Sequence, residues 1–316
     1  MAIISVLLVL LAEWGAPELE RFRRHDWYAR YHAWLERQLG ERRFWDSPLG
    51  LLLVLGVPVV VLIILQSLLA LMLFGLPVFL LAVAVLFLSL GPVNLLRQTR
   101  DYLQADEDDA ESAGRLALAT EISGSHSEDL EEANADVRDA VLAQANDRLF
   151  GVLFWFMLLG PAGALLYRMT VEAHDRSAPV DNESGYEDAP AVDEEAGVSL
   201  AETLARGSFA ESAERLHGIL AWIPARLLVL AYALTGSFED TLVAWREQLD
   251  RAGASLHDNT LGVLLAAGRG ALRLEPGQSG PRCSFDCVRS ALKLVERSLV
   301  VWVVLLALMT LVGWVV

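Results

Sequence analysis

The stretch that decides the fold runs from Asn146 to Arg168 and reads Asn-Asp-Arg-Leu-Phe-Gly-Val-Leu-Phe-Trp-Phe-Met-Leu-Leu-Gly-Pro-Ala-Gly-Ala-Leu-Leu-Tyr-Arg. A polar trio precedes an apolar run about as long as one bilayer crossing, and a Tyr-Arg pair closes it. Proline lacks a backbone N–H and clashes with the preceding turn, so a break is predicted at Gly160-Pro161. Two interpretations remain open: a kinked transmembrane helix with interfacial anchors, or a site built where the helix breaks, as in transporters with discontinuous helices.

Composition points to a membrane protein. The chain has 316 residues, of which 54% are hydrophobic, and its mean hydropathy of +0.39 exceeds that of a usual soluble domain. Continuous Leu-rich runs predict an all-α polytopic integral membrane protein of five or six membrane segments, organised as one domain over residues 1–316, and not a β-barrel. The net charge is −16, and no basic stripe with interleaved aromatic residues occurs outside residues 21–43, so nucleic-acid binding is disfavoured.

Apolar periodicity locates the membrane helices. They are expected over residues 2–12, 49–74 and 77–96 and from 299 to the C-terminus, and the second and third form a hairpin. Residues 17–43 alternate arginines with aromatic residues, which is typical of an amphipathic helix lying in the lipid headgroup layer on the cytoplasmic side. Membrane lipids are therefore the first expected partners.

The remaining segments are polar or interrupted. A polar helical insert is predicted over 98–148, with helices at 107–122 and 128–147, and a flexible acidic loop over 172–200. A helix is expected over 200–222, and Pro224 either starts a short half-helix or re-entrant segment or lies within a helix that joins 216–222 across the break. Further helices are expected at 238–251, capped by Ser237, at 260–273, capped by Asp258 or Asn259, and from 284 onward.

Arg and Lys placement predicts an outside N-terminus and cytoplasmic segments at 17–43, 98–146 and 237–296. The acidic loop over 172–200 is periplasmic if residues 216–236 cross the membrane, which is preferred, and cytoplasmic if the run at 149–168 is re-entrant.

Two cysteines, Cys283 and Cys287, are too few for a disulfide framework or a four-cysteine zinc site. Their spacing places them on one helix face, and they are interpreted as two small helix residues, with a redox or metal pair as the alternative. No histidine lies near them in sequence. No metal site and no catalytic residue are predicted.

Ionisable residues among apolar ones mark a candidate binding site. The charged side chain of Arg226 has a high free energy in hydrocarbon unless it is paired with a carboxylate. Glu13 and Asp147 are its candidate partners. Tyr167 and Arg168 lie at the far end of their run, and they join the same site only if the Gly160-Pro161 break folds the chain back. The predicted polar site consists of Glu13, Asn146, Asp147, Tyr167, Arg168 and Arg226.

The run Gly160-Pro161-Ala162-Gly163-Ala164-Leu165-Leu166-Tyr167-Arg168, with Phe154-Trp155-Phe156 before it and Ile223-Pro224-Ala225-Arg226 after it, resembles the CobD/CbiB superfamily of cobalamin-biosynthesis membrane synthases. The resemblance covers most of the chain. Asp147 matches an Asp of that pattern. Elsewhere the polar pattern is replaced: Ala143 and Gln144 stand for Glu and Asn, Val171 and His174 for Asn and Asp, and His217, Gly218 and Ala221 for an acidic pair and Asn. A Ser-Pro-Asn motif is missing between 252 and 280.

A retained scaffold with an altered polar site is similar to the AmpE branch of this superfamily. That resemblance implies an inner-membrane regulatory signalling modulator linked to β-lactamase induction, peptidoglycan recycling and antibiotic resistance, without catalytic activity. Other inner-membrane or cell-wall recycling proteins are the implied partners. No cofactor is expected: ATP is implied by the resemblance alone, since no Walker-type loop is present. The alternatives are an ATP-dependent amide-forming synthase, as in the cobalamin relatives, or a module that binds or transports lipids or small molecules.

Overall fold

The computed structural model describes residues 2–15, 27–39, 48–71, 75–91, 94–104, 109–177, 200–250, 255–273 and 283–311. Within these ranges all regular structure is helical, so the all-α prediction is confirmed. The helices are α1 (Ala2–Gly15), α3 (Trp27–Leu39), α4 (Pro48–Ala70), α5 (Leu76–Ser89), α6 (Leu95–Gln104), α7 (Asp109–Ser123), α8 (Leu130–Ala145), the π-helical turn η2 (Asn146–Phe150), α9 (Gly151–Leu159), α10 (Pro161–Ser177), α11 (Leu200–Thr235), α12 (Phe238–Asp250), α13 (Leu256–Ala271) and α14 (Phe285–Leu311).

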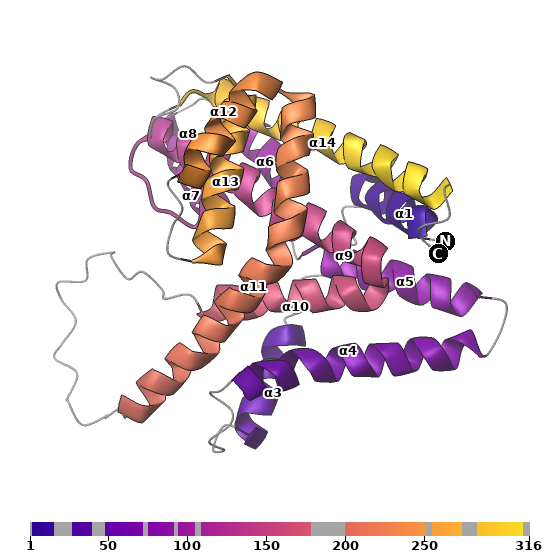
Figure 1. Cartoon of the computed structure of the whole chain (residues 1–316). Helices are drawn as coiled ribbons and strands as arrows, with labels where there is room; N and C mark the ends of the chain where they lie inside the picture. Colours follow the sequence, from indigo (N-terminus) through magenta and orange to yellow (C-terminus); the bar gives the residue numbers. More distant parts are fainter. Residues whose placement is uncertain are drawn as a thin grey trace.

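The main core forms where α8, η2 and α9 meet α11, α13 and α14 (Figure 1). Phe150 is fully buried there, and its ring centroid lies 5.5 Å from that of Trp302 on α14. A second, smaller cluster joins α3, α4, α10 and α11 through side chains such as Tyr28, Val54 and Met169. Because α10 and α11 contribute to both clusters, they connect the two parts of the molecule.

The break at Gly160 folds the chain back on itself. Gly160 has φ 69°, which is in the left-handed region that favours glycine, and α10 starts immediately after it at Pro161. Gly163 then allows close approach, since a Cβ there would lie 2.3 Å from the carbonyl oxygen of Trp155. The run from 149 to 168 is therefore a helical hairpin. This corrects the expectation of a kinked helix that crosses the membrane once, and the hairpin has the geometry of the re-entrant alternative.

Pro224 does not end a helix. The 36-residue α11 continues through it, as the joined alternative held. A proline at this position leaves the carbonyl of Leu220, four residues earlier, without its usual N–H donor. The indole Nε1 of Trp155 donates to that oxygen at 3.0 Å. A side chain from α9 thus satisfies the backbone group that the proline frees.

Other predicted boundaries need smaller corrections. The polar insert contains α7 and α8, which pack against each other, close to the predicted ranges. The predicted acidic loop is helical up to Ser177, and its residues 178–199 lie outside the described ranges. In the predicted amphipathic segment 17–43, the structure describes only α3, over 27–39. Ser237 directly precedes α12, and its Oγ donates to the carboxylate of Asp240. The cap of α13 is Ser255, whose Oγ accepts from the Asp258 N–H at 3.0 Å, and not the predicted Asp258 or Asn259.

Two helical segments are long and apolar enough to span a membrane by length and composition: Leu49–Ala70 in α4 and Phe209–Thr235 in α11. The apolar helices Ile3–Ala12 and Leu76–Ser89 are shorter. In the part of the chain that the structure describes, these two candidate spans do not confirm the predicted five or six membrane segments.

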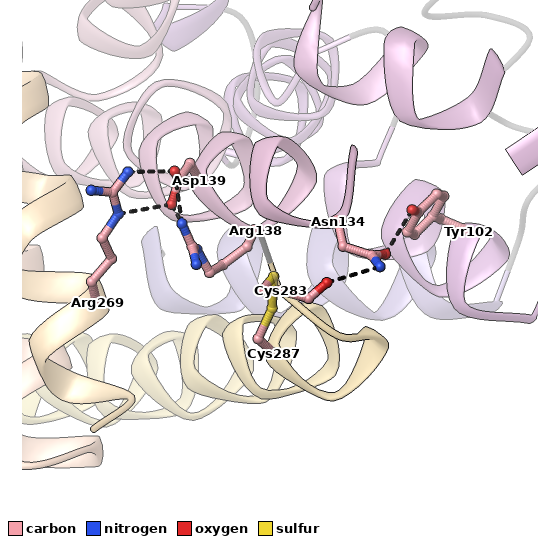
Figure 2. The surroundings of a disulfide bond; sticks show 7 residues. All are labelled: Tyr102, Asn134, Arg138, Asp139, Arg269, Cys283 and Cys287. Carbon is pink, nitrogen blue, oxygen red and sulfur yellow. Dashed lines mark hydrogen bonds and ion pairs between the residues drawn. A yellow bond between two sulfur atoms is a disulfide. The ribbon is translucent and has the colours of Figure 1, made fainter. Parts of the chain in front are cut away.

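The cysteine pair forms a disulfide, which corrects its interpretation as two unlinked helix residues (Figure 2). Cys283 precedes α14 and lies outside it, and Cys287 is in the first turn; both are buried. The Cys283 N–H donates to the carbonyl of Glu131 at 2.9 Å, and Nδ2 of Asn134 donates to the Cys283 carbonyl at 3.1 Å. Asn134 in turn accepts from the Tyr102 hydroxyl at 2.8 Å. The start of α14 is thereby fixed to α8.

Candidate functional site

The candidate site is centred on Asp147, in the π-helical turn that joins α8 to α9. Its Oδ1 accepts from the Tyr167 hydroxyl at 2.7 Å and from Nδ2 of Asn146 at 3.1 Å, and lies 3.2 Å from Nε2 of His217 on α11. A π-turn inserts an extra residue into the helix, a feature often found at functional sites. The fold-back at Gly160 brings Tyr167 to this carboxylate. Three elements distant in sequence therefore converge on one oxygen.

Charge at Asp147 is stabilised by these partners. Burial alone would raise the pKa of this carboxyl group, but the neighbouring His217 and hydrogen bonds from His217, Tyr167 and Asn146 lower the pKa to about 2. Asp147 is consequently an anion at neutral pH. The Oδ1 of Asn146 is buried and has no hydrogen-bond partner among the described residues, so one acceptor at this site has no protein donor.

Three histidines from three helices meet beside Asp147. They are His174 on α10, His217 on α11 and His257 at the start of α13, and we call them the histidine cluster. Nδ1 of His217 lies 3.1 Å from Nδ1 of His257, and the His174 ring lies over both, with centroids at 4.8 Å from His217 and 4.4 Å from His257. Burial lowers the pKa of His257, and the neighbouring His217 and His174 lower it further, which favours the neutral imidazole.

Two arginines, Arg148 and Arg168, lie near Asp147. Arg148 donates to Oε1 of Gln98 on α6 at 3.4 Å, and Arg168 pairs with Glu172 one turn along α10. Burial lowers the pKa of Arg148, and the positive charge of Arg168 lowers it further. Arg168 also lies against Gly91, where a Cβ would come within 3.4 Å of its guanidinium. The two arginines thus contact α6 and Gly91, whereas the imidazole side of the site faces α13.

A pocket of about 350 Å³ opens on the imidazole side. Carboxylates dominate its polar lining, and small or aliphatic side chains cover the rest; its residues include Asp136, Asp139, Asp147, Asp175, Gln144, Ala143, His174, His257 and Leu265. Asp139 is paired with two arginines, and the other three carboxylates favour a cationic ligand or a ligand rich in hydrogen-bond donors.

One wall of the pocket is held by an arginine network (Figure 2). Asp139 bridges Arg138, 2.8 Å away and fully buried on α8, and Arg269 on α13, with Nη2 at 2.5 Å. Burial alone would raise the pKa of Asp139, but hydrogen bonds from Arg269 and Arg138 lower the pKa below its usual value. The network joins α8 to α13 at the pocket, which keeps the wall in place.

The structure groups part of the predicted polar site. Asn146, Asp147 and Tyr167 are in mutual contact, and Arg168 lies nearby. Arg226 is elsewhere: its guanidinium lies 4.1 Å from the ring centroid of Trp222, whose carbonyl it contacts at 3.3 Å on its own helix. The side chain of Glu13 lies outside the described residues.

In the sequence, His174 and His217 stand out only as departures from the CobD/CbiB pattern, and His257 has no such signal. These three are half of the chain's six histidines, which was the one available signal.

The N-terminal part of the chain matches a known protein family. The family model described as "CobD/Cbib protein" matches residues 6–175, more than half of the chain. The chain belongs to the CobD/CbiB family. In this family member, the matched region includes the hairpin, Asp147, Tyr167 and His174. A second model, "Regulatory signalling modulator protein AmpE", matches residues 204–316, which hold His217, His257 and the disulfide.

Two curated relatives extend the comparison. "Cobalamin biosynthesis protein CobD" of Chromobacterium violaceum is 27% identical over 71% of this chain and 68% of its own length. The protein of the same name in Stutzerimonas stutzeri is 30% identical over 60% of this chain and 54% of its own. The chain thus spans little more than half of the second relative. No solved structure matches this chain.

Proposed function

We propose that this chain is a bacterial inner-membrane regulatory protein of the AmpE type, which binds a ligand at the Asp147 site without catalysing amide formation. One observation carries the proposal: four of the seven positions that depart from the synthase pattern line one cavity or contact its Asp147. Ala143, Gln144 and His174 line the pocket, and His217 contacts Asp147. The altered chemistry is therefore concentrated at the site, while the helical scaffold around it is kept. The AmpE match over the C-terminal part supports the same reading.

A multi-pass membrane location is part of this proposal. The apolar part of α4 has 22 residues, a length of about 33 Å, which fits the hydrocarbon core of a bilayer. Its side chains are largely exposed, with Leu52 at 69% and Val61 at 58%. Large apolar side chains are also exposed on α1, α5 and the C-terminal half of α14, which run to the same side of the molecule (Figure 1). Lipid would cover this surface, and two short helices would enter the bilayer beside the longer ones.

The regulatory role is tested by complementation. A strain with inducible β-lactamase and no copy of this gene would receive the wild type, Asp147→Asn or the control Glu239→Gln, whose carboxylate is exposed on α12. We expect wild type and the control to restore the induction response and Asp147→Asn to reduce it at equal protein level in the membrane. An induction response that does not depend on the gene at all would contradict the proposal.

An amide-forming synthase is the second candidate. It is favoured by the names of the two curated relatives, both of which are cobalamin biosynthesis proteins, and by the retained Asp147 and Tyr167–Arg168 pair. Purified protein incubated with ATP, cobyric acid and an amino alcohol distinguishes the two candidates. Formation of the amide product, lost in Asp147→Asn, would replace the regulatory proposal with this one.

A further inference from the structure

We propose that the histidine cluster, His174, His217 and His257, binds a single Zn²⁺ ion. The metal site goes beyond the regulatory proposal and does not depend on it, since it rests on the geometry of three imidazoles. The ligand atoms of the three residues lie within 4.8 Å of one another. They come from α10, α11 and α13, so an ion there would cross-link three helices at the edge of the pocket.

The distance between two of the rings suits one ion. Tetrahedral zinc holds imidazole nitrogens at about 2.0–2.1 Å, which puts neighbouring ligand nitrogens about 3.3 Å apart. Nδ1 of His217 and Nδ1 of His257 are 3.1 Å apart and face each other. Two such nitrogens need a proton or a cation between them, and a modest separation of the two helices accommodates the cation.

His217 already contacts a carboxylate of the kind that orients zinc-binding histidines. A metal-bound histidine usually donates its other ring N–H to a carboxylate or a carbonyl, which fixes its tautomer and orientation. Nε2 of His217 lies 3.2 Å from Oδ1 of Asp147, which is also held by Tyr167. With the proton on Nε2, the lone pair of His217 is on Nδ1, the atom that faces His257.

His174 supplies the third nitrogen. Its ring now stacks on the other two, with interplanar angles of 30° to His217 and 41° to His257, so binding requires the ring to turn its edge toward the ion. The side chain is 20% exposed and lies at the pocket surface, which gives it room to turn. Its Nδ1 is 3.4 Å from the carboxylate of Asp175, a second potential orienting partner.

The donor set selects the metal. Neutral imidazoles favour zinc and other late first-row ions over Mg²⁺ and Ca²⁺, which prefer oxygen ligands. Three protein ligands leave the fourth tetrahedral position for an oxygen from the pocket, either water or a polar group of a bound molecule. The acidic lining of the pocket raises the local concentration of cations around this position.

The test uses the full chain purified in detergent with an affinity tag that contains no histidine. Co²⁺, which reports tetrahedral coordination through its visible absorption, is titrated first, and Zn²⁺ is then added to displace it. The variants are His174→Gln, His257→Gln and Asp147→Asn. His126→Gln is the matched control, because His126 is exposed between α7 and α8 and is not part of the cluster. Circular dichroism and gel filtration verify that each variant is folded.

We expect one Co²⁺ per chain with a tetrahedral spectrum, displaced by Zn²⁺, in the wild type and in His126→Gln. Asp147→Asn should lose about 10- to 100-fold in affinity, as for other orienting partners, and each folded ligand variant should lose more. Absence of a tetrahedral spectrum, or a spectrum unchanged in both His174→Gln and His257→Gln, would overturn the metal site. A failed induction assay leaves this result untouched, so the two proposals fail separately.

Discussion

Asp139→Ala tests the arginine network at the pocket wall. The Asp139 carboxylate contacts Arg138 through Nε at 2.8 Å and Nη2 at 3.0 Å, and Arg269 through Nε at 3.1 Å and Nη2 at 2.5 Å. Arg138 has 0% of its side chain exposed, whereas Arg269 is 37% exposed. Removing one partner of a buried ion pair costs about 3–5 kcal/mol, and an exposed pair contributes about 0–1 kcal/mol.

We expect Asp139→Ala to lower the free energy of unfolding by about 3 kcal/mol, the lower end of that range, because Asp139 itself is 21% exposed. Nearly all of this loss should come through Arg138, so Arg269→Ala should cost no more than about 1 kcal/mol. The measurement is denaturant unfolding of the purified protein in detergent, followed by circular dichroism.

The double variant Arg138→Met/Asp139→Leu provides the decisive comparison. If the cost of Asp139→Ala is the burial of a guanidinium that has lost its carboxylate, removing both charges should recover part of the stability. A double variant as unstable as Asp139→Ala, or a single variant that loses less than about 1 kcal/mol, would refute the reasoning.

Three further predictions concern the pH dependence of stability, the packing at Gly151 and the membrane topology. Because the pKa of Asp139 is lowered, its contribution to stability is complete above the pKa of the unfolded chain and is lost as the pH falls through the folded value; unfolding measured from about pH 6 to about pH 3 should therefore be less pH-dependent in Asp139→Asn than in the wild type. Gly151→Ala places a Cβ 2.4 Å from the ring of Tyr167 and should cost about 1–3 kcal/mol, while the control Gly114→Ala, on an exposed helix face with no atom within 4 Å, should gain up to about 1 kcal/mol; equal effects would contradict the packing argument. The helical hairpin returns the chain to the side of the polar insert, so a cysteine at Ser184 should react with a membrane-impermeant maleimide in opened but not in intact cells, and reaction in intact cells would restore the single crossing.

Local chemistry determined much of this protein from sequence alone. Apolar runs and the polar residues between them predict most helices to within a few residues, because helix periodicity and caps are properties of short segments. Proline and glycine likewise marked the break at Gly160-Pro161. The combination of a retained Asp147 and Tyr167 with altered neighbours also indicated where the site would be.

Tertiary structure decided what those segments do together. The sequence predicts that the helix breaks at Gly160-Pro161, but not the angle between the two helices. The positive φ of Gly160 and the close packing at Gly163 make the run a hairpin and not a single crossing. Likewise, the Leu220 carbonyl that Pro224 leaves without a donor accepts a hydrogen bond from Trp155, which lies 65 positions earlier in the sequence. No local pattern connects these two residues. His174, His217 and His257 are separated by about 40 residues each, and only the packing of α10, α11 and α13 places their nitrogens together. Contacts between distant residues depend on the sum of many weak packing interactions, and for that reason the sequence located the elements whereas the folded chain assembled the site.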